Sequence, residues 1–241
     1  MELKRILVAD IRLRSDLNVS CIQQIGSDAA IAAAARVSTS GVTSASSDGM
    51  DGLINYLLQH RHGSPFEHGS LTVAIEAPIF VAREFMRHRV GWSYSEASAR
   101  YMDMEPEFYV PSEERPLAPM GSSARPVFAA LGREPYIEGV KTLTKSYENA
   151  YSDYEYLLDL GWAREVARAV LGTGVYTSWY ATANPRSIMH FLSLRTHEEK
   201  ATFVSYPQWE IERVARSIER VFAEHWPITH AKFVANGRVA P

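Results

Sequence analysis

Residues 87 to 101 read Arg-His-Arg-Val-Gly-Trp-Ser-Tyr-Ser-Glu-Ala-Ser-Ala-Arg-Tyr and follow an apolar segment that is predicted to be helical. The two arginines and the histidine fall at the C-terminal end of this helix, where cations interact favourably with the helix dipole. Further along, Glu96, Ser98 and Arg100 alternate with small residues, so in an extended segment they point to one side. We interpret this stretch either as a polar pocket for an anion or nucleotide or as a solvated surface cluster.

The composition is that of an ordinary soluble globular protein. The 241-residue chain is 46% hydrophobic and 22% charged, and it is long enough for one well-packed domain. No apolar run approaches the roughly 18 to 20 residues that span a bilayer, and residues 1–10 lack the apolar segment of a signal peptide. We therefore expect a cytoplasmic protein with no membrane partner. The net charge of −3 argues against nucleic-acid binding through a bulk positive field.

The numbers of arginine, lysine and cysteine residues restrict the kinds of binding site and covalent bond that the sequence supports. Arginine outnumbers lysine 20 to 5, which reflects either genomic base composition or a need for bidentate donors to phosphates and carboxylates. The single cysteine, Cys21, excludes an internal disulfide. The sequence contains no phosphate loop, dinucleotide-binding glycine motif or zinc-ligand spacing, so no metal is predicted.

Periodicity and helix-breaking residues predict a helix-rich α+β fold without regular strand–helix alternation. Helices are expected over residues 28–36, 53–62, 78–89, 134–160, 165–171, 185–194 and 208–224, and strands over 1–10, 71–75 and 175–183. Gly63 is expected to be the C-cap of the second helix. The segments expected to be irregular are residues 37–51, 106–125 and 196–207.

Three further segments contain candidate ligand residues. His68 ends a turn before an apolar strand, and a histidine in such a position is more often structural than functional. Arg168 lies among apolar residues and is either half of a surface ion pair or an inward-facing anion ligand. Asn184 precedes a helix-initiating proline, as a helix N-cap does, and Arg186 and His190 lie four residues apart on that helix.

In chain order, these segments resemble the flavin-dependent thymidylate synthase family. The family signature is Arg-His-Arg, seven residues, a serine and then Arg-Tyr, whereas eight residues separate Arg89 from Ser98 here. The other segments that match are residues 64–68, 77–83, 107–111, 164–168 and 184–187, so the resemblance extends over roughly residues 33–222. It implies a single domain over residues 1–241, with an antiparallel-type sheet flanked by long helices.

The resemblance also implies an activity. Members of this family methylate dUMP to dTMP, with methylenetetrahydrofolate as the carbon donor and NADPH-reduced FAD as the hydride source, in a homotetramer whose active sites are assembled between chains. Since the only thiol, Cys21, is distant in sequence from the matching positions, we expect a reaction without a cysteine nucleophile. Two alternatives are a related flavin-dependent hydroxymethyltransferase and a non-enzymatic nucleotide-binding protein.

Individual residues match positions with known roles in the family. Arg195 matches the catalytic position, where a fixed cation stabilises an enolate-like pyrimidine. Ser98 is expected to bind rather than attack, since no adjacent base is evident. The positions that match FAD-binding residues are His68, Ser70, Arg87, His88, Arg89, Val90, Glu96, Asn184, Arg186 and His190. Those that match dUMP-binding residues are Glu84, Arg87, Glu96, Ser98, Ala99, Arg100, Arg168 and Arg195.

The chain departs from the family pattern in a few places. Glu84 stands where glutamine is common, and Ser95 where asparagine is usual. His190 stands where a flavin-binding asparagine is frequent, and it keeps a hydrogen-bonding group without the amide geometry. Residues 196–207 form a longer segment than expected, which we interpret as a solvated insertion or as part of an entrance lid.

Overall fold

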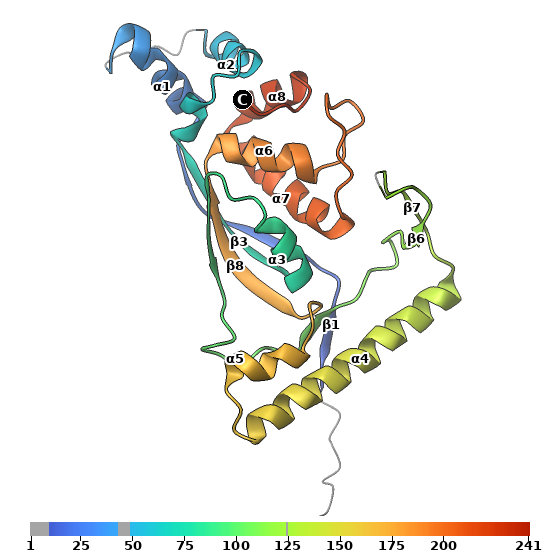
Figure 1. Cartoon of the computed structure of the whole chain (residues 1–241). Coiled ribbons are helices and arrows are strands. Elements are labelled where there is room, and N and C mark those ends of the chain that lie inside the picture. The colour runs from blue at the N-terminus through green and yellow to red at the C-terminus, as the bar shows by residue number, and fades with distance from the viewer. Residues whose placement is uncertain (1–9, 43–48, 124) are drawn as a thin grey trace, which may run out of the picture. The chain divides into compact units, whose positions relative to one another are not determined.

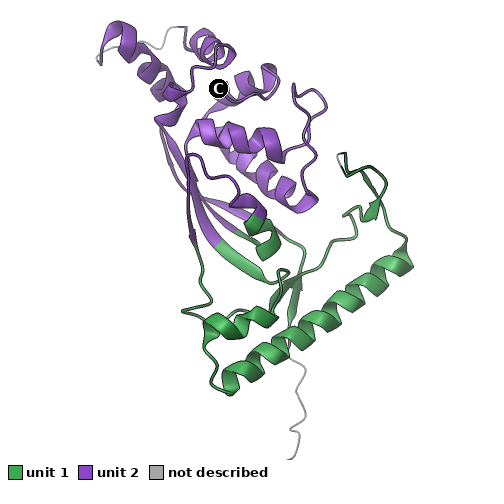
Figure 2. Cartoon of the chain, viewed as in Figure 1, with its two compact units in different colours: residues 1–16, 76–83, 96–178 green, residues 17–75, 84–95, 179–241 purple. Residues whose placement is uncertain are grey.

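The structure is a computed structural model in which residues 10–42, 49–123 and 125–241 are described (Figure 1). Contacts divide the chain into two compact units (Figure 2). Unit 1 contains residues 1–16, 76–83 and 96–178, and unit 2 contains residues 17–75, 84–95 and 179–241. Strands β3 (Ser70–Pro78) and β8 (Tyr176–Ala183) and helix α3 (Ile79–Phe85) begin in one unit and end in the other.

A four-stranded sheet in the order β2-β3-β8-β4 contains β3 and β8 as its central strands, with β2 (Asn18–Ile25) and β4 (Trp92–Glu96) at its edges. The hydroxyl groups of Thr72 and Thr182 are 2.9 Å apart, and the N–H of Ile79 donates to the carbonyl of Val175 at 3.0 Å. As the residue number increases along β3, the number of the residue opposite it on β8 decreases, so the two strands are antiparallel. The predicted α+β class and antiparallel-type sheet are confirmed.

The helices of unit 2 are α1 (Asp28–Ser40), α2 (Met50–Gln59), α6 (Pro185–Arg195), α7 (Trp209–His225), α8 (Pro227–Ala235) and the short 3-10 helix η1 (Ser64–Glu67). Helix α7 packs on β2, α6 and α8, and α8 packs on α2. The buried carboxylate of Asp28 accepts hydrogen bonds from the N–H groups of Ile228 and Thr229, at 2.8 and 2.9 Å. It therefore satisfies the otherwise unpaired donors in the first turn of α8.

Unit 1 contains the long helix α4 (Arg133–Asp159), the short helices α5 (Arg164–Ala167) and η2 (Arg168–Val170), and strands β1 (Arg12–Arg14), β5 (Glu107–Tyr109), β6 (Ala118–Pro119) and β7 (Phe128–Ala129). Strand β1 pairs with β5 in parallel, and β6 pairs with β7 in antiparallel fashion. Its core is a cluster of buried side chains around Phe108, Tyr154, Leu171 and Val175. Of the residues of α4, only Tyr154 is fully buried.

Several predicted boundaries were wrong. Helix α2 ends at Gln59, and its C-cap is His60 rather than Gly63. Gly63 instead leaves room for Arg186, whose guanidinium carbon would lie 2.6 Å from an added Cβ atom. The helix predicted over residues 78–89 ends at Phe85, where a turn leads to Gly91.

The loop predicted over residues 37–51 is shorter than expected because α1 continues to Ser40, and residues 43–48 lie outside the described part of the chain. The predicted irregular segment 106–125 contains strands β5 and β6. The strand predicted over residues 1–10 lies, except for residue 10, outside the described part of the chain, and no prediction covered β2 or α8.

Candidate functional site

A cavity of about 200 Å³ in unit 1 is lined by four of the predicted nucleotide-binding residues. These are Glu96, Ser98, Ala99 and Arg168, and Thr177 lines the cavity beside them. The rest of its wall is mostly apolar and includes Ile79 of α3, Leu171 and Val175. A carboxylate, a hydroxyl and a guanidinium around a partly apolar cavity suit a ligand with both a polar and an apolar face.

The carboxylate of Glu96 is held by a residue that sequence reasoning missed. Glu96 ends strand β4, and Thr177 lies on the neighbouring strand β8. The Oγ1 hydroxyl of Thr177 donates to Oε1 of Glu96 at 2.8 Å. The strands adjoin there, since the N–H of Ala97 donates to the carbonyl of Ser178 at 2.9 Å. Only the register between β4 and β8 reveals this pair.

The chain turns directly after Glu96. The N–H of Tyr101 donates to the carbonyl of Ser98 at 3.0 Å, and the Ser98 hydroxyl accepts from the N–H of Arg100 at 3.3 Å. The predicted extended segment with Glu96, Ser98 and Arg100 on one side is therefore wrong. Ser98 lines the cavity with Glu96, whereas the Arg100 side chain is exposed and pairs with Glu165 at 3.0 Å.

One residue, Glu165, contacts two predicted phosphate ligands. Its carboxylate pairs with Arg100, and its carbonyl oxygen accepts from Nε of Arg168 at 3.3 Å. Arg164, on the same short helix, pairs with Asp103 at the surface. Arg164 thus forms a surface ion pair, whereas the exposed Arg168 forms no ion pair with the described residues and contributes to the lining of the cavity; its role as an anion ligand stays a prediction.

In unit 2, the end of α6 meets the end of α3. Arg195, the last residue of α6, donates from Nε to Nε2 of His88 at 2.9 Å. Its Nη1 atom pairs with the carboxylate of Glu84. The side chains of Arg195 and Glu84 are only 21% and 24% exposed. The predicted catalytic arginine is thus held by two other predicted site residues.

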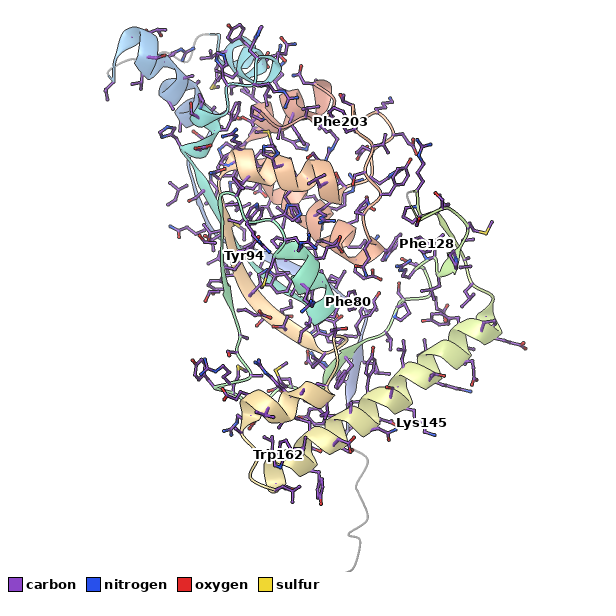
Figure 3. The ribbon with its side chains drawn as sticks, viewed as in Figure 1. Phe80, Tyr94, Phe128, Lys145, Trp162 and Phe203 are labelled. Atoms are coloured by element: carbon purple, nitrogen blue, oxygen red, sulfur yellow. The ribbon has the colours of Figure 1, made fainter. Side chains whose placement is uncertain are left out.

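The environment of His88 keeps its imidazole neutral. Burial, the charge of Arg195 and the charge of His190 together lower the pKa of His88 to about 4. Its ring packs edge-on against Phe191, with ring centroids 4.8 Å apart. The hydroxyl of Tyr94 on β4 donates to the carbonyl of His88 (Figure 3). At neutral pH His88 is therefore a hydrogen-bonding group and not a cation.

The two arginines that flank His88 point outwards. Arg87 and Arg89 are exposed, and Val90 is 87% exposed. Within residues 10–42, 49–123 and 125–241, neither arginine forms a hydrogen bond or ion pair. Their charges are therefore available to an anionic ligand, for which guanidinium groups are bidentate donors.

The first turn of α6 contains further predicted FAD-binding residues. The side chain of Asn184 caps this helix by accepting a backbone N–H at 2.9 Å, as the sequence indicated. Arg186 is already engaged, since it pairs with Glu67 at 2.6 Å and donates to the carbonyl of Pro241 at 2.8 Å. Burial and the charge of Arg186 lower the pKa of His190.

His68 directly follows η1, and Ser70 is the first residue of β3. His68 is exposed and Ser70 is half-buried. In the part of the chain that the structure describes, neither side chain is engaged in a hydrogen bond. Both side chains are therefore available to a ligand.

Residues 196–207 are anchored rather than simply solvated. Arg216 on α7 donates to the carboxylate of Glu198 at 2.5 Å and to the carbonyl of His197 at 2.6 Å. The buried Arg238 donates to the hydroxyl of Thr196 at 2.8 Å. Phe203 is the exposed apolar side chain of this segment (Figure 3).

None of the described helices combines the length and hydropathy needed to cross a membrane. No group of histidine, cysteine, aspartate or glutamate side chains in the described ranges is arranged to hold a metal ion.

The two groups of residues together define a class of protein. A cavity with Glu96, Ser98 and Arg168, and unpaired arginines beside a neutral histidine, are the features of a protein that binds anionic, nucleotide-like ligands.

Comparison with known proteins specifies this class further. The family model described as "Thymidylate synthase complementing protein" matches residues 20–228. The chain is 50% identical to the flavin-dependent thymidylate synthase of Streptomyces coelicolor over 96% of each chain. It is 45% identical to that of Tropheryma whipplei over 97% of this chain and 99% of the other.

A solved structure is similar as well. The UMP/dUMP methylase PolB from Streptomyces cacaoi, bound with 5-Br dUMP, superimposes with a TM-score of 0.90 and 47% identity, over 96% of this chain and 100% of PolB. The chain belongs to the flavin-dependent thymidylate synthase family, also described as thymidylate synthase complementing proteins.

Proposed function

We propose that this enzyme converts dUMP to dTMP, with methylenetetrahydrofolate as the carbon donor and NADPH-reduced FAD as the hydride source. The observation that carries this proposal is the cavity in which Glu96, Ser98 and Arg168 come together, in a chain 50% identical to a flavin-dependent thymidylate synthase. These are three of the residues that the resemblance to the family assigns to dUMP.

The cavity residues have the chemistry that a pyrimidine nucleotide requires. Arg168, together with the neighbouring Arg100, supplies donors for a phosphate. Ser98 supplies a hydroxyl, the backbone at Ala99 supplies further polar groups, and Glu96 supplies an acceptor for N–H or O–H groups. In this proposal Ser98 binds the nucleotide and does not attack it.

The residues assigned to FAD fit an anionic dinucleotide. The positive charges of the unpaired Arg87 and Arg89 are complementary to the negative charge of its pyrophosphate. The neutral His88 adds a hydrogen-bonding group that carries no charge. Bound FAD, reduced by NADPH, would supply the hydride that turns the transferred carbon into a methyl group. The remaining residues assigned to it are His68, Ser70, Val90, Glu96, Asn184, Arg186 and His190.

Arg195 is proposed to act as a fixed cation. Its guanidinium is a donor only and remains charged, so it can stabilise an anionic pyrimidine ring without transferring a proton. Glu84 and His88 hold its Nη1 and Nε atoms, which restricts it to one orientation. Preorganised groups of this kind need no rearrangement when charge develops on the substrate.

The reaction is proposed to need no cysteine. Cys21 is exposed on the edge strand β2. The Cys21→Ser variant should form dTMP at the wild-type rate, and loss of turnover with intact FAD absorbance would overturn cysteine independence.

Three further expectations belong to the same proposal: a cytoplasmic location, a homotetramer with active sites shared between chains, and cooperative unfolding of residues 1–241 as one domain. Light scattering measures the assembly, and calorimetry should show a single unfolding transition. Since strands β3, β4 and β8 and helix α3 continue from one unit into the other, separate transitions are not expected.

The decisive experiment follows the proposed cofactor. The purified protein should carry FAD absorbance, which NADPH should bleach under anaerobic conditions. Addition of dUMP and methylenetetrahydrofolate should restore the oxidised spectrum and form dTMP in equal amount. A colourless protein that does not bind added FAD would overturn the proposal in favour of a non-enzymatic nucleotide-binding protein, and a hydroxymethyl product would identify the related transferase.

A second substrate is favoured by one comparison. The PolB structure, which is 47% identical to this chain, is described as a UMP/dUMP methylase. UMP should therefore be assayed beside dUMP, with kcat/KM measured for each. A ratio near one would assign dual specificity to this chain.

A further inference from the structure

We propose that Thr177 is a positioning residue that fixes the carboxylate of Glu96 in the cavity and thereby sets the affinity for the nucleotide. The inference rests on the proposed function, because it takes dUMP as the ligand of this cavity. Thr177 itself is not required to touch the nucleotide.

Thr177 is well suited to hold another side chain. It is 8% exposed, it lies on a central strand of the sheet, and its β-branched side chain has few accessible rotamers. Its hydroxyl donates to Oε1 of Glu96 at 2.8 Å. An ionised carboxylate only accepts hydrogen bonds, so the direction of this bond is fixed.

Glu96 needs such a restraint because little else holds it. It is an exposed residue at the end of an edge strand, and the chain turns immediately after it. Its side chain has several rotatable bonds, and ordering it costs conformational entropy. Among the described residues, the bond from Thr177 is the one hydrogen bond to its carboxylate, which leaves Oε2 to accept from a ligand.

Thr177 and Glu96 therefore have different roles, and they lie on neighbouring strands. Thr177 on β8 restricts Glu96 to rotamers that direct the carboxylate into the cavity, and Glu96 on β4 presents the acceptor to an N–H or O–H group of the nucleotide. Ordering a side chain during binding costs entropy and weakens the affinity. A nucleotide that binds to an already ordered carboxylate avoids this cost.

The test compares four variants of the FAD-loaded protein: Thr177→Val, Thr177→Ser, Glu96→Ala and the Thr177→Val/Glu96→Ala double variant. Valine has nearly the shape of threonine without the donor, and serine keeps the donor. Thr144→Val is the matched control, because the Thr144 hydroxyl donates to a carbonyl within α4 at 2.8 Å. The dissociation constant for dUMP is measured by calorimetry, and folding by thermal melting.

Thr177→Val should weaken dUMP binding about tenfold, as expected for the loss of a hydrogen bond to a charged group. Thr177→Ser should stay within about threefold of the wild type, because the donor remains. In the Glu96→Ala background, Thr177→Val should have no further effect, since the carboxylate that it positions is absent. FAD absorbance and the binding by Thr144→Val should not change.

Equal dUMP affinity of wild type and Thr177→Val would overturn the inference and leave the proposed function intact. A tenfold loss in the Glu96→Ala background would also overturn it, because Thr177 would then act independently of Glu96. If Thr177→Val does not fold, the comparison of Thr177→Ser with wild type decides, and a loss well beyond threefold refutes the role of the hydroxyl. Wild-type protein that does not bind dUMP overturns the proposed function itself.

Discussion

Arg195 donates its Nε–H to Nε2 of His88 across 2.9 Å, and this bond fixes the tautomer of the histidine. A guanidinium has no acceptor, so Nε2 must supply a lone pair and the proton of the neutral imidazole must be on Nδ1. His88 therefore presents an N–H donor on its other side. The arginine proposed to stabilise the pyrimidine also determines what His88 can offer to a flavin.

The first prediction concerns the pKa of His88. Burial is the largest cause of its decrease to about 4, followed by the charge of Arg195. Arg195→Gln removes the second cause, so the pKa should rise part of the way towards 6.5. An NMR titration of the histidine Cε1–H signals measures this change.

His197 serves as a control within the same sample. Its pKa is raised by a hydrogen bond to the backbone of Ser205 and by Glu199, and it should not move in Arg195→Gln. An unchanged His88 pKa would show that burial alone keeps this imidazole neutral. In the wild type the depressed pKa also means that this group's contribution to stability is lost as the pH falls from about 6.5 towards 4.

The second prediction concerns the anchor of Arg195. Glu84→Ala removes the carboxylate that holds Nη1 and should lower kcat about tenfold, whereas Glu84→Gln keeps an acceptor and should remain within about threefold. The rate of dTMP formation at saturating substrate gives the comparison, and thermal melting reports folding. Equal loss in both variants would mean that the negative charge, rather than the orientation of Arg195, is what matters.

The third prediction concerns the ion pair between Arg100 and Glu165. A nucleotide phosphate must compete with this carboxylate, so Glu165→Gln should tighten dUMP binding about two- to threefold at low salt. The gain should shrink in high salt, which screens exposed charges. Asp103→Asn is the matched control, because Asp103 pairs with Arg164, which lies next to Glu165 but does not line the cavity. Weaker binding in Glu165→Gln would instead make Glu165 an organiser of the site.

The fourth prediction separates binding from attack at Ser98. Its hydroxyl accepts the N–H of Arg100, and among the described residues no side chain accepts a hydrogen bond from it. Ser98→Ala should therefore raise the KM for dUMP about tenfold and keep measurable turnover. Complete loss of turnover with intact folding and dUMP binding would indicate a nucleophile.

The sequence predicted elements with strong local signals. Proline at the start of α6, the cap at Asn184 and the long amphipathic pattern of α4 led to nearly correct boundaries. Errors occurred where contacts distant in sequence decide the structure. Gly63 leaves the space that the Arg186 side chain occupies, and it does not end α2.

In the candidate site, too, the sequence identified some residues and missed those whose role depends on contacts between distant segments. The resemblance selected Glu96, Ser98 and Arg168, and the structure brings them to one cavity. Thr177 could not be found, because its pairing with Glu96 depends on how β8 aligns with β4. The alternation from Glu96 to Arg100 failed because a turn, rather than a strand, follows Glu96.

The cap that Asp28 provides for α8 has a consequence for the order in which the protein can form. Asp28 is made early in synthesis, and its partners at Ile228 and Thr229 are made 200 residues later. Until they emerge from the ribosome, α1 has no partner for a carboxylate that ends up buried. The cap between α1 and α8 in unit 2 therefore cannot form until the last part of the chain has been synthesised.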